Sequence, residues 1–477
     1  MQIGNRFRCY PSPAQEKVLL QWIGCQRFIY NAKVQEDRYF RTFARKSLDH
    51  TGQFAPIDQQ YSQFKHPELT PWLSEVPSQL LRNGAVKWMQ AYSRFFAGLA
   101  GRPSIQTKHG KQSVWLTREL FSFEPIKDET GKVTHHLLHL GTKKHPLGCL
   151  SFTAHRDYTL PASIHLSIHA GHWHLSFNYD DGIAEPSAEE TTQWLRSFSA
   201  PELTSVTLGL DRGVHIPLAA SDGQNFDFRA IEKKRLAQQE KHKKRWQRRQ
   251  ARRVKGSKRW KKAQRRVAQS QQYAANLRRD FCHQTSHALV ADPAYKLYVL
   301  EALKVKNMAT SAKGDTEKPG KNVQQKAGLN RAILASGWGQ IKVYTQYKAL
   351  RAGKLCIEVP AHYSSQECSQ CGFTHPDNRC SQAEFVCQSC HYTDNADTNA
   401  AKVLAQRGVA LILGDDVAEK KVKRARVKQQ KVGAECSKPA GTNQLTLVET
   451  WVNRQAGNSL ACRSVKRETP ATTPIGV

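Results

Sequence analysis

The sequence contains no run of about 18 consecutive apolar residues, the length that a membrane-spanning helix needs, so no transmembrane helix is expected. Its first residues lack the apolar segment of a secretion signal, and we therefore expect a cytoplasmic protein. Acidic residues are scarce: 40 Asp and Glu stand against 72 Lys and Arg, a formal net charge of +32 over 477 residues. Such a charge repels itself unless a polyanion neutralises it, which favours nucleic acid as the partner over the alternative, an anionic membrane surface.

The cysteines lack the spacing of a disulfide framework, because five of the 12 fall within one short stretch and the others are scattered. The stretch contains two Cys-x2-Cys pairs separated by fifteen residues, a spacing typical of a zinc ribbon whose metal supplies folding free energy. The predicted ligands of one structural Zn²⁺ are Cys368, Cys371, Cys387 and Cys390. Cys380 is left as a spare thiol, and His375 and His391 are less favoured substitutes for a thiolate.

The composition indicates several folded domains. Hydrophobic residues make up 39% of the chain, with 10 Trp, 14 Tyr and 18 Phe, which excludes a wholly disordered protein. At about 150 residues per domain, the length predicts three domains. Helical spacing of apolar residues in 13–125, with Ser12 as the first cap, gives way in 126–200 to the alternation typical of antiparallel strands. The sequence after about 411 has no periodicity and is expected to be a basic tail.

Histidines recur in the alternating segments, for example after Trp173. They could ligate a metal, but we favour the simpler interpretation that they lie on the side of the strands that faces solvent or nucleic acid. Gly171, between two such segments, predicts a hairpin turn. Trp22 and Phe28 are expected in a core, whereas Trp246 is a candidate for stacking on a nucleic-acid base.

The excess positive charge is concentrated in one segment. Residues 232–279 contain 20 Lys and Arg but only 2 Glu, and we expect a helical hairpin over 232–288 that turns near Gly256. A charged face in water is the ordinary explanation of such a run, but at this density self-repulsion favours a phosphate backbone as the counterion. The predicted backbone contacts are Lys244, Arg245, Arg248, Arg249, Arg252 and Arg253.

Three carboxylates end or begin predicted elements: Asp211 ends a strand over 203–211, Glu301 ends a strand over 295–301, and Asp397 opens a helix. Each one alone is weak evidence, and Asp397 is equally well explained as a helix cap. If the three converge, they repel one another unless divalent cations bind, and oxygen ligands select Mg²⁺ or Mn²⁺. Two such ions clamp the attacking and leaving oxygens of a phosphodiester, which makes these residues the predicted catalytic set.

Between the second strand and a third one at 355–359, the sequence predicts a mobile loop over 311–328 and a single helix over 329–351.

Motifs in the same order resemble those of the TnpB (OrfB) proteins of insertion sequences, which are related to the type V CRISPR effectors. The carboxylate motifs Gly209-Leu-Asp211-Arg-Gly213, Val299-Leu-Glu301 and Asp397-Thr-Asn399-Ala-Ala401 are similar to the three RuvC motifs of that family. Gly337-Trp338-Gly339 and the first cysteine pair fill the gaps between them, and Arg27-Phe-Ile-Tyr-Asn31 resembles the N-terminal segment of the family. The resemblance covers roughly residues 5–45 and 160–410.

The resemblance implies an α/β fold: an RNase H-like (RuvC) nuclease core with an inserted zinc ribbon, a β-barrel wedge domain and a helical recognition domain. The implied domains are the first wedge strand at 1–12, the recognition domain at 13–125, the wedge barrel at 126–200, RuvC at 201–360, the zinc ribbon at 361–392, the last RuvC helix at 393–410 and a tail at 411–477. It assigns Asp211, Glu301 and Asp397 to catalysis and to two Mg²⁺ or Mn²⁺ ions, and the four cysteines to Zn²⁺.

The implied activity is cleavage of double-stranded DNA beside a short T-rich motif, directed by a guide RNA from the transposon end. One protein per guide RNA is expected, with a dimer as the alternative, in the prokaryotic cytoplasm at the nucleoid and with no membrane partner. A compact type V CRISPR effector and a nuclease-silent RNA-guided repressor are the alternatives, and a strand-joining transposase is a third. The complete set of three acids favours a nuclease over the repressor.

Overall fold

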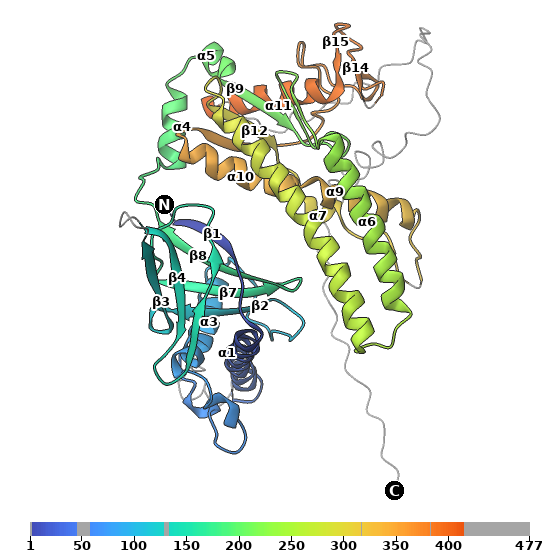
Figure 1. Ribbon diagram of the computed structural model, residues 1–477. Coiled ribbons are helices and arrows are strands. Elements are labelled where there is room, and N and C mark those ends of the chain that lie inside the picture. Colours follow the sequence, from blue (N-terminus) through green and yellow to red (C-terminus); the bar gives the residue numbers. More distant parts are fainter. Residues whose placement is uncertain (1, 45–57, 128–132, 316, 382, 415–477) are drawn as a thin grey trace. The chain divides into compact units, whose positions relative to one another are not determined.

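A computed structural model describes residues 2–44, 58–127, 133–315, 317–381 and 383–414 (Figure 1). Contacts divide the chain into two units, Met1–Ala184 with His242–Gln272, and Glu185–Lys241 with Tyr273–Val477. Within the described ranges no helix combines the length and the apolar character needed to cross a membrane. The tail predicted beyond 411 falls almost wholly outside the described residues.

The first unit contains two antiparallel sheets. One has the order β2-β7-β8-β1-β6 and the other the order β3-β4-β5. The strands are β1 Gln2–Cys9, β2 Gln112–Thr117, β3 Phe121–Lys127, β4 Val133–Gly141, β5 Pro146–Leu150, β6 Phe152–Thr153, β7 Ser163–His169 and β8 His172–Asp180. β7 and β8 form the predicted hairpin, whose turn residues Ala170 and Gly171 both have positive φ (52° and 80°). The strand expected within residues 1–12 is present as β1.

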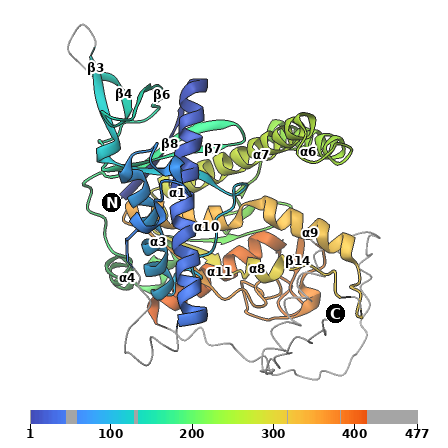
Figure 2. The ribbon, with the colours of Figure 1, turned by 90° about the horizontal axis from the view of Figure 1, so that it is seen from below.

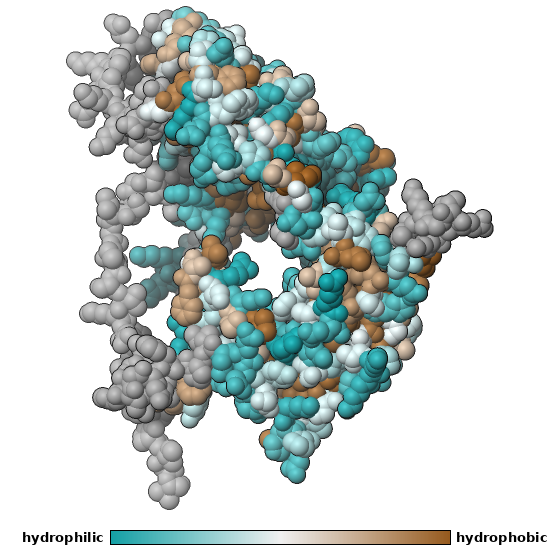
Figure 3. Space-filling view, turned by 90° about the vertical axis from the view of Figure 1, so that its left-hand side faces the viewer, coloured by the Kyte–Doolittle hydropathy of each residue, from teal (hydrophilic) through white to brown (hydrophobic). Residues whose placement is uncertain are grey.

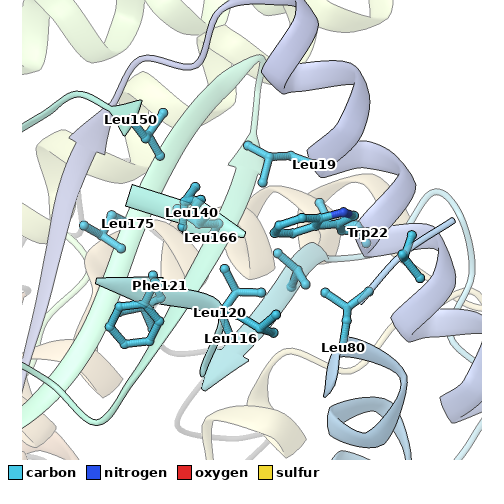
Figure 4. Close-up of a cluster of buried hydrophobic side chains, with 14 of the residues drawn as sticks. Leu19, Trp22, Leu80, Leu116, Leu120, Phe121, Leu140, Leu150, Leu166 and Leu175 are labelled. Carbon is cyan, nitrogen blue, oxygen red and sulfur yellow. The ribbon is translucent and has the colours of Figure 1, made fainter. Parts of the chain in front are cut away.

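Two helices pack on these sheets, α1 Pro13–Tyr39 and α3 Ser78–Phe96. The predicted cap is confirmed, since Ser12 and Gln15 form a capping box at the start of α1. Trp22 is buried in the core between helices and strands (Figure 4), as expected. Phe28 is not: it is 36% exposed and contacts the edge of Trp72. The short helical turns are η1 Phe40–Ala44, η2 Ser62–Phe64, η3 Pro71–Leu73 and η4 Arg118–Leu120.

The boundary expected near residue 126 between helices and strands is wrong. The helical part ends at Phe96, and β2 and β3 precede the expected boundary. Val114 and Leu116 of β2 are fully buried, whereas Ser113, Trp115 and Thr117 are only partly buried, so a period of two decides the local structure. At the other end of the expected strand region the chain is helical, with α4 Ala188–Arg196 and α5 Ala200–Ser205.

The second unit is built on one five-stranded sheet of order β11-β10-β9-β12-β13. Its strands are β9 Thr207–Asp211, β10 Leu218–Ala220, β11 Asn225–Phe226, β12 Leu297–Glu301 and β13 Leu355–Val359. β9, β10 and β11 form an antiparallel meander, whereas β9, β12 and β13 are parallel. The first strand is shorter than expected because residues 200–205 belong to α5.

Both faces of this sheet are covered, which explains why its central strands are almost uniformly apolar (Figures 1 and 2). One face packs on α7 Lys258–Ala291 and α10 Trp338–Arg351, and the other on α4, α5 and α11 Ala396–Leu413. α11 approaches β9 very closely: a Cβ added at Gly209 would lie 1.9 Å from the carbonyl oxygen of Ala401. Gly209 is therefore required for this contact.

The expected basic hairpin consists of α6 Ala230–Ala251 and α7, which are separate helices with Gly256 between them. The single helix expected over 329–351 is instead two helices, α9 Val323–Ser336 and α10, because Gly337 adopts a left-handed conformation with φ 79°. α9 also occupies the end of the expected loop at 311–328, and a short α8 Val305–Met308 follows β12. The remaining elements are η5 Pro376–Asn378, β14 Glu384–Val386 and β15 Thr393–Asn395.

Candidate active site and metal centre

The three predicted carboxylates lie in one region of the second unit. Asp211 and Glu301 end the adjacent parallel strands β9 and β12, in which Leu210 pairs with Leu300. Asp397 lies in the first turn of α11, which packs on β9. The carboxyl groups of Glu301 and Asp397 both act electrostatically on Asp211. Topology therefore brings together residues that are up to 186 positions apart in the chain, from 211 to 397.

The raised pKa values of the acids show that this arrangement lacks positive charge. Burial, together with repulsion from Glu301 and Asp397, raises the pKa of Asp211 well above its usual range. Burial likewise raises the pKa of Glu301 to about 7. Three ionised carboxylates are unfavourable here without added positive charge, and a divalent cation with oxygen ligands supplies it. The donor set thus fits Mg²⁺ or Mn²⁺, although the oxygens are less closely grouped than the four cysteine sulfurs described below.

Arg212 provides part of the compensating charge, a role that sequence reasoning missed. Its side chain is buried and lies against Glu301, with Nε 3.9 Å from Oε1, and it donates to the backbone carbonyl of Glu301. It also reaches Glu358 of β13, whose other oxygen pairs with Lys342 of α10. Successive ion pairs therefore link Lys342 of α10, Glu358 of β13 and Arg212 to the catalytic candidate Glu301. The only sign of this role in the sequence is that Arg212 directly follows Asp211.

Arg379 is a second cation that sequence reasoning missed. Its Nη2 atom lies 3.1 Å from Oδ1 of Asp397. Its charge also offsets part of the rise in the pKa of Asp211. Asp397 is not the helix cap, because the side-chain oxygen of Asn395 accepts from the backbone N–H of Asp397 at 3.0 Å and of Thr398 at 3.3 Å. Asn395 performs the capping, so the carboxylate of Asp397 is available for another role.

The four predicted zinc ligands form a compact group. Their sulfur atoms all lie within 4.8 Å of one another, with Cys368 and Cys390 3.6 Å apart and Cys371 and Cys387 also 3.6 Å apart. Within the described ranges this is the one group of three or more metal-ligating side chains so close together, and no histidine belongs to it. The cysteines therefore fit a single tetrahedral metal ion.

The two cysteine pairs adopt the same turn. In each, a left-handed residue follows the second cysteine: Gly372 with φ 71° and His391 with φ 57°. The backbone N–H groups of Ser389 and Cys390 point at the sulfur of Cys387 and lower its pKa to about 7 in spite of burial, which favours the thiolate.

The spare positions near the cysteines lie outside this group. Cys380 donates to the carbonyl of Asp377, and His375 stacks on Phe373 with a centroid distance of 6.0 Å.

The cysteine module is tied directly to the helix that carries Asp397. The side chain of Asn399 accepts from the N–H of Ser369 at 3.0 Å and donates to the carbonyl of Glu367 at 2.8 Å. Gln406 adds a bond to the carbonyl of Ser369 at 2.7 Å. Asn399 is fully buried, so its bonds couple the cysteine module to α11 and, through this helix, to the position of Asp397.

The six predicted backbone contacts lie on α6 and in the turn that follows it. All six are exposed, and the guanidinium of Arg249 lies 4.7 Å from the centroid of the Trp246 ring. Polar residues also cover most of the face shown in Figure 3. Exposure is what a contact to a nucleic-acid backbone requires, and it leaves their role a prediction.

Three family models match this sequence. The "Probable transposase" model of OrfB from IS605 elements matches residues 187–312, a Cas12f1-like TNB domain matches 338–404, and a helix-turn-helix domain of the same OrfB family matches 1–38. In 1–38 the structure has β1 and most of the 27-residue helix α1.

Two curated relatives are similar in sequence. The chain is 29% identical over 423 residues to the putative RNA-guided DNA endonuclease InsQ of Escherichia coli (strain K12), covering 85% of this chain and 92% of that protein. It is 41% identical over 71 residues to the CRISPR-associated endodeoxyribonuclease Cas12f1 of Sulfoacidibacillus thermotolerans, covering 15% of this chain and 17% of that protein.

Solved structures give weaker likenesses. A Cas12f1–sgRNA–target DNA complex has a TM-score of 0.46 at 11% identity, covering 85% of this chain and 98% of that one. The mini-RNA-guided endonuclease CRISPR-Cas_phi3 has a TM-score of 0.43 at 11% identity, covering 87% and 92%.

Proposed function

Because the chain belongs to the TnpB (OrfB) family, we propose that it is an RNA-guided DNA endonuclease of an insertion sequence. The observation that carries the proposal is the meeting of Asp211, Glu301 and Asp397 at the ends of β9 and β12 and the start of α11. The likeness to InsQ, over 85% of this chain and 92% of that protein, supports the proposal.

In this proposal the second unit is an RNase H-like (RuvC) core. Its sheet, an antiparallel meander continued by two parallel strands, places two carboxylates side by side at the carboxyl ends of neighbouring strands. The first unit combines the wedge sheets with the recognition helices α1 and α3. The cysteine module is the inserted zinc ribbon.

The acids would hold two Mg²⁺ or Mn²⁺ ions. Ions bound there supply an activated water and neutralise the leaving oxygen of a phosphodiester. The chain's own residues position the ligands: Arg212 holds Glu301, Arg379 holds Asp397, and the contact at Gly209 fixes the distance of α11 from β9. Zn²⁺ on Cys368, Cys371, Cys387 and Cys390 would keep Arg379 and the start of α11 in place.

The partners are a guide RNA from the transposon end and target double-stranded DNA beside a short T-rich motif. The exposed cations from Lys244 to Arg253 neutralise backbone phosphates without reading sequence. One protein per guide RNA acts in the cytoplasm at the nucleoid. The match to a Cas12f1-like domain at 338–404 keeps a compact type V CRISPR effector as the second candidate.

The test is to express the protein from its native locus, purify it and sequence the RNA that co-purifies. The complex is then given a plasmid that carries the 3′-end sequence of that RNA beside a randomised flank, with Mg²⁺ or with EDTA. RNA from the overlapping transposon end and Mg²⁺-dependent linearisation would support the proposal, and the depleted flanks would give the DNA motif. RNA from a CRISPR array would favour the second candidate, and absence of RNA would overturn both.

A further inference from the structure

A cationic pocket lies in the first unit, far in sequence from the carboxylates. It is a partly open hollow with about 240 Å³ of empty space, open solvent included, between α1, α3, β2 and the segment around Gln106. Its cations come from three different elements or loops: Arg27 on α1, Lys87 on α3, and Lys111 just before β2. None of its lining residues is acidic, so the pocket has an uncompensated positive charge.

Lys87 shows that this charge is unusual. Burial, and secondarily the charge of Lys111, lowers the pKa of Lys87. Within the described ranges its ammonium group has no ion pair and no hydrogen bond. Lys33 on α1, by contrast, is fully buried but has two acidic partners, Glu36 and Asp58. A partly buried cation without a partner costs free energy, which an anionic ligand would recover.

The walls of the pocket are fixed by hydrogen bonds that leave its donors free to face a ligand. The amide of Gln26 bonds the backbone of Trp115 in both directions, at 2.9 Å each. Asn31 does the same for Gln106, at 2.8 and 2.9 Å. Arg27 is oriented by a neutral acceptor, the side-chain oxygen of Gln112 at 3.0 Å, and keeps its full charge.

The ligand that fits is a small tetrahedral anion with several acceptor oxygens. The guanidinium of Arg27 and the ammonium groups of Lys87 and Lys111 are donors without acceptor capacity, and the hydroxyl of Ser113 can donate one more hydrogen bond. We propose that this pocket binds one backbone phosphate of a nucleic acid and so fixes the register of the strand on the first unit. This inference rests on the proposed function for the identity of the ligand, and the phosphate can come from the guide RNA or from the target DNA.

The test compares Lys87→Met and Lys111→Met with the matched control Lys17→Met, an exposed lysine of α1 that does not line the pocket. Methionine keeps the apolar stem and removes the charge. Affinity is measured between 50 and 200 mM salt in two arms: free protein with its guide RNA, and the assembled ribonucleoprotein with duplex target DNA. Melting temperatures are measured for all variants.

We expect each pocket variant to lose about tenfold in affinity in one arm, the range of a charged hydrogen bond. The slope of log affinity against log salt should become shallower by about 0.7 if the phosphate belongs to single-stranded RNA and by about 0.9 if it belongs to duplex DNA. The melting temperature of Lys87→Met should not fall, because no partner is lost.

If the salt slopes of Lys87→Met and Lys111→Met equal that of Lys17→Met in both arms, while wild type binds normally, phosphate binding in the pocket is refuted and the proposed function stays intact. A lower melting temperature with an unchanged slope would show that Lys87 is structural and would also overturn it. Failure of wild type to bind either RNA or DNA would refute the proposed function together with the inference.

Discussion

Removal of the Arg212 guanidinium should destabilise the second unit in a way that divalent cations repair. Arg212 is 5% exposed and lies between Glu301 and Glu358. In Arg212→Met, Glu301 loses the cation beside it while it still acts on the carboxyl of Asp211, and Glu358 keeps only its pair with Lys342. Breaking a buried pair by removing one partner typically costs 3–5 kcal/mol, because an uncompensated charge stays buried.

We take the lower end, about 3 kcal/mol, because Lys342 still pairs with Glu358. For a unit of this size, 1 kcal/mol shifts the melting temperature by about 2–4 °C, which gives a fall of roughly 6–12 °C in EDTA. Mg²⁺ should recover more of the melting temperature in the variant than it adds to wild type, because the bound ion takes over the compensation of charge.

The assay is differential scanning calorimetry in EDTA and in Mg²⁺. The unfolding transition of the second unit is identified as the one whose melting temperature Asp211→Ala also shifts. Arg229→Met is the matched control, since its ion pair with Glu232 is exposed on the arginine side and is expected to contribute little to stability. A fall no larger than that of the control, or a fall that Mg²⁺ does not reduce, would refute the reasoning.

Two further predictions concern the metal sites. Cys387→Ser should lower soluble yield and zinc content together, measured by elemental analysis, whereas Cys380→Ser, outside the four-cysteine group, should change neither; unchanged zinc in Cys387→Ser would contradict the ribbon. In EDTA, the melting temperature should fall as pH rises from about 4.5 to about 7. Burial raises the pKa of Glu301 from 4.5 to about 7, so in this range the folded state keeps a proton that the unfolded state releases. The stability that this tighter proton binding contributes is lost as pH rises to about 7. Glu301→Gln should flatten this dependence, and an equally steep profile in that variant would rule out Glu301 as its source.

The carboxylates and the cysteines were predictable because their signals are local. Each strand that ends in an acid is an apolar run, and each cysteine pair has a fixed spacing. Gly171 and Ser12 were predictable for the same reason, since a hairpin turn and a capping box each need only a few neighbouring residues.

The missed features depend on contacts between distant segments. Arg212 and Glu358 are 146 positions apart, and only the pairing of β12 with β13 brings them together. The left-handed backbone at Gly337 ends α9, and packing also requires glycine there, because a Cβ would lie 2.7 Å from the sulfur of the distant Cys282. Phe28 lies at a position that helical spacing alone assigned to the core, yet it is exposed beside Trp72.

The most direct test of the central claim is plasmid cleavage by the purified ribonucleoprotein with a matched target. Wild type should linearise the plasmid in Mg²⁺ and not in EDTA, and only with the matching guide. Asp211→Ala should abolish cleavage but keep guide-dependent DNA binding within a few-fold, because phosphate contacts far from the acids supply the binding free energy. Cleavage by Asp211→Ala at the wild-type rate, or equal cleavage with a scrambled guide, would contradict the account.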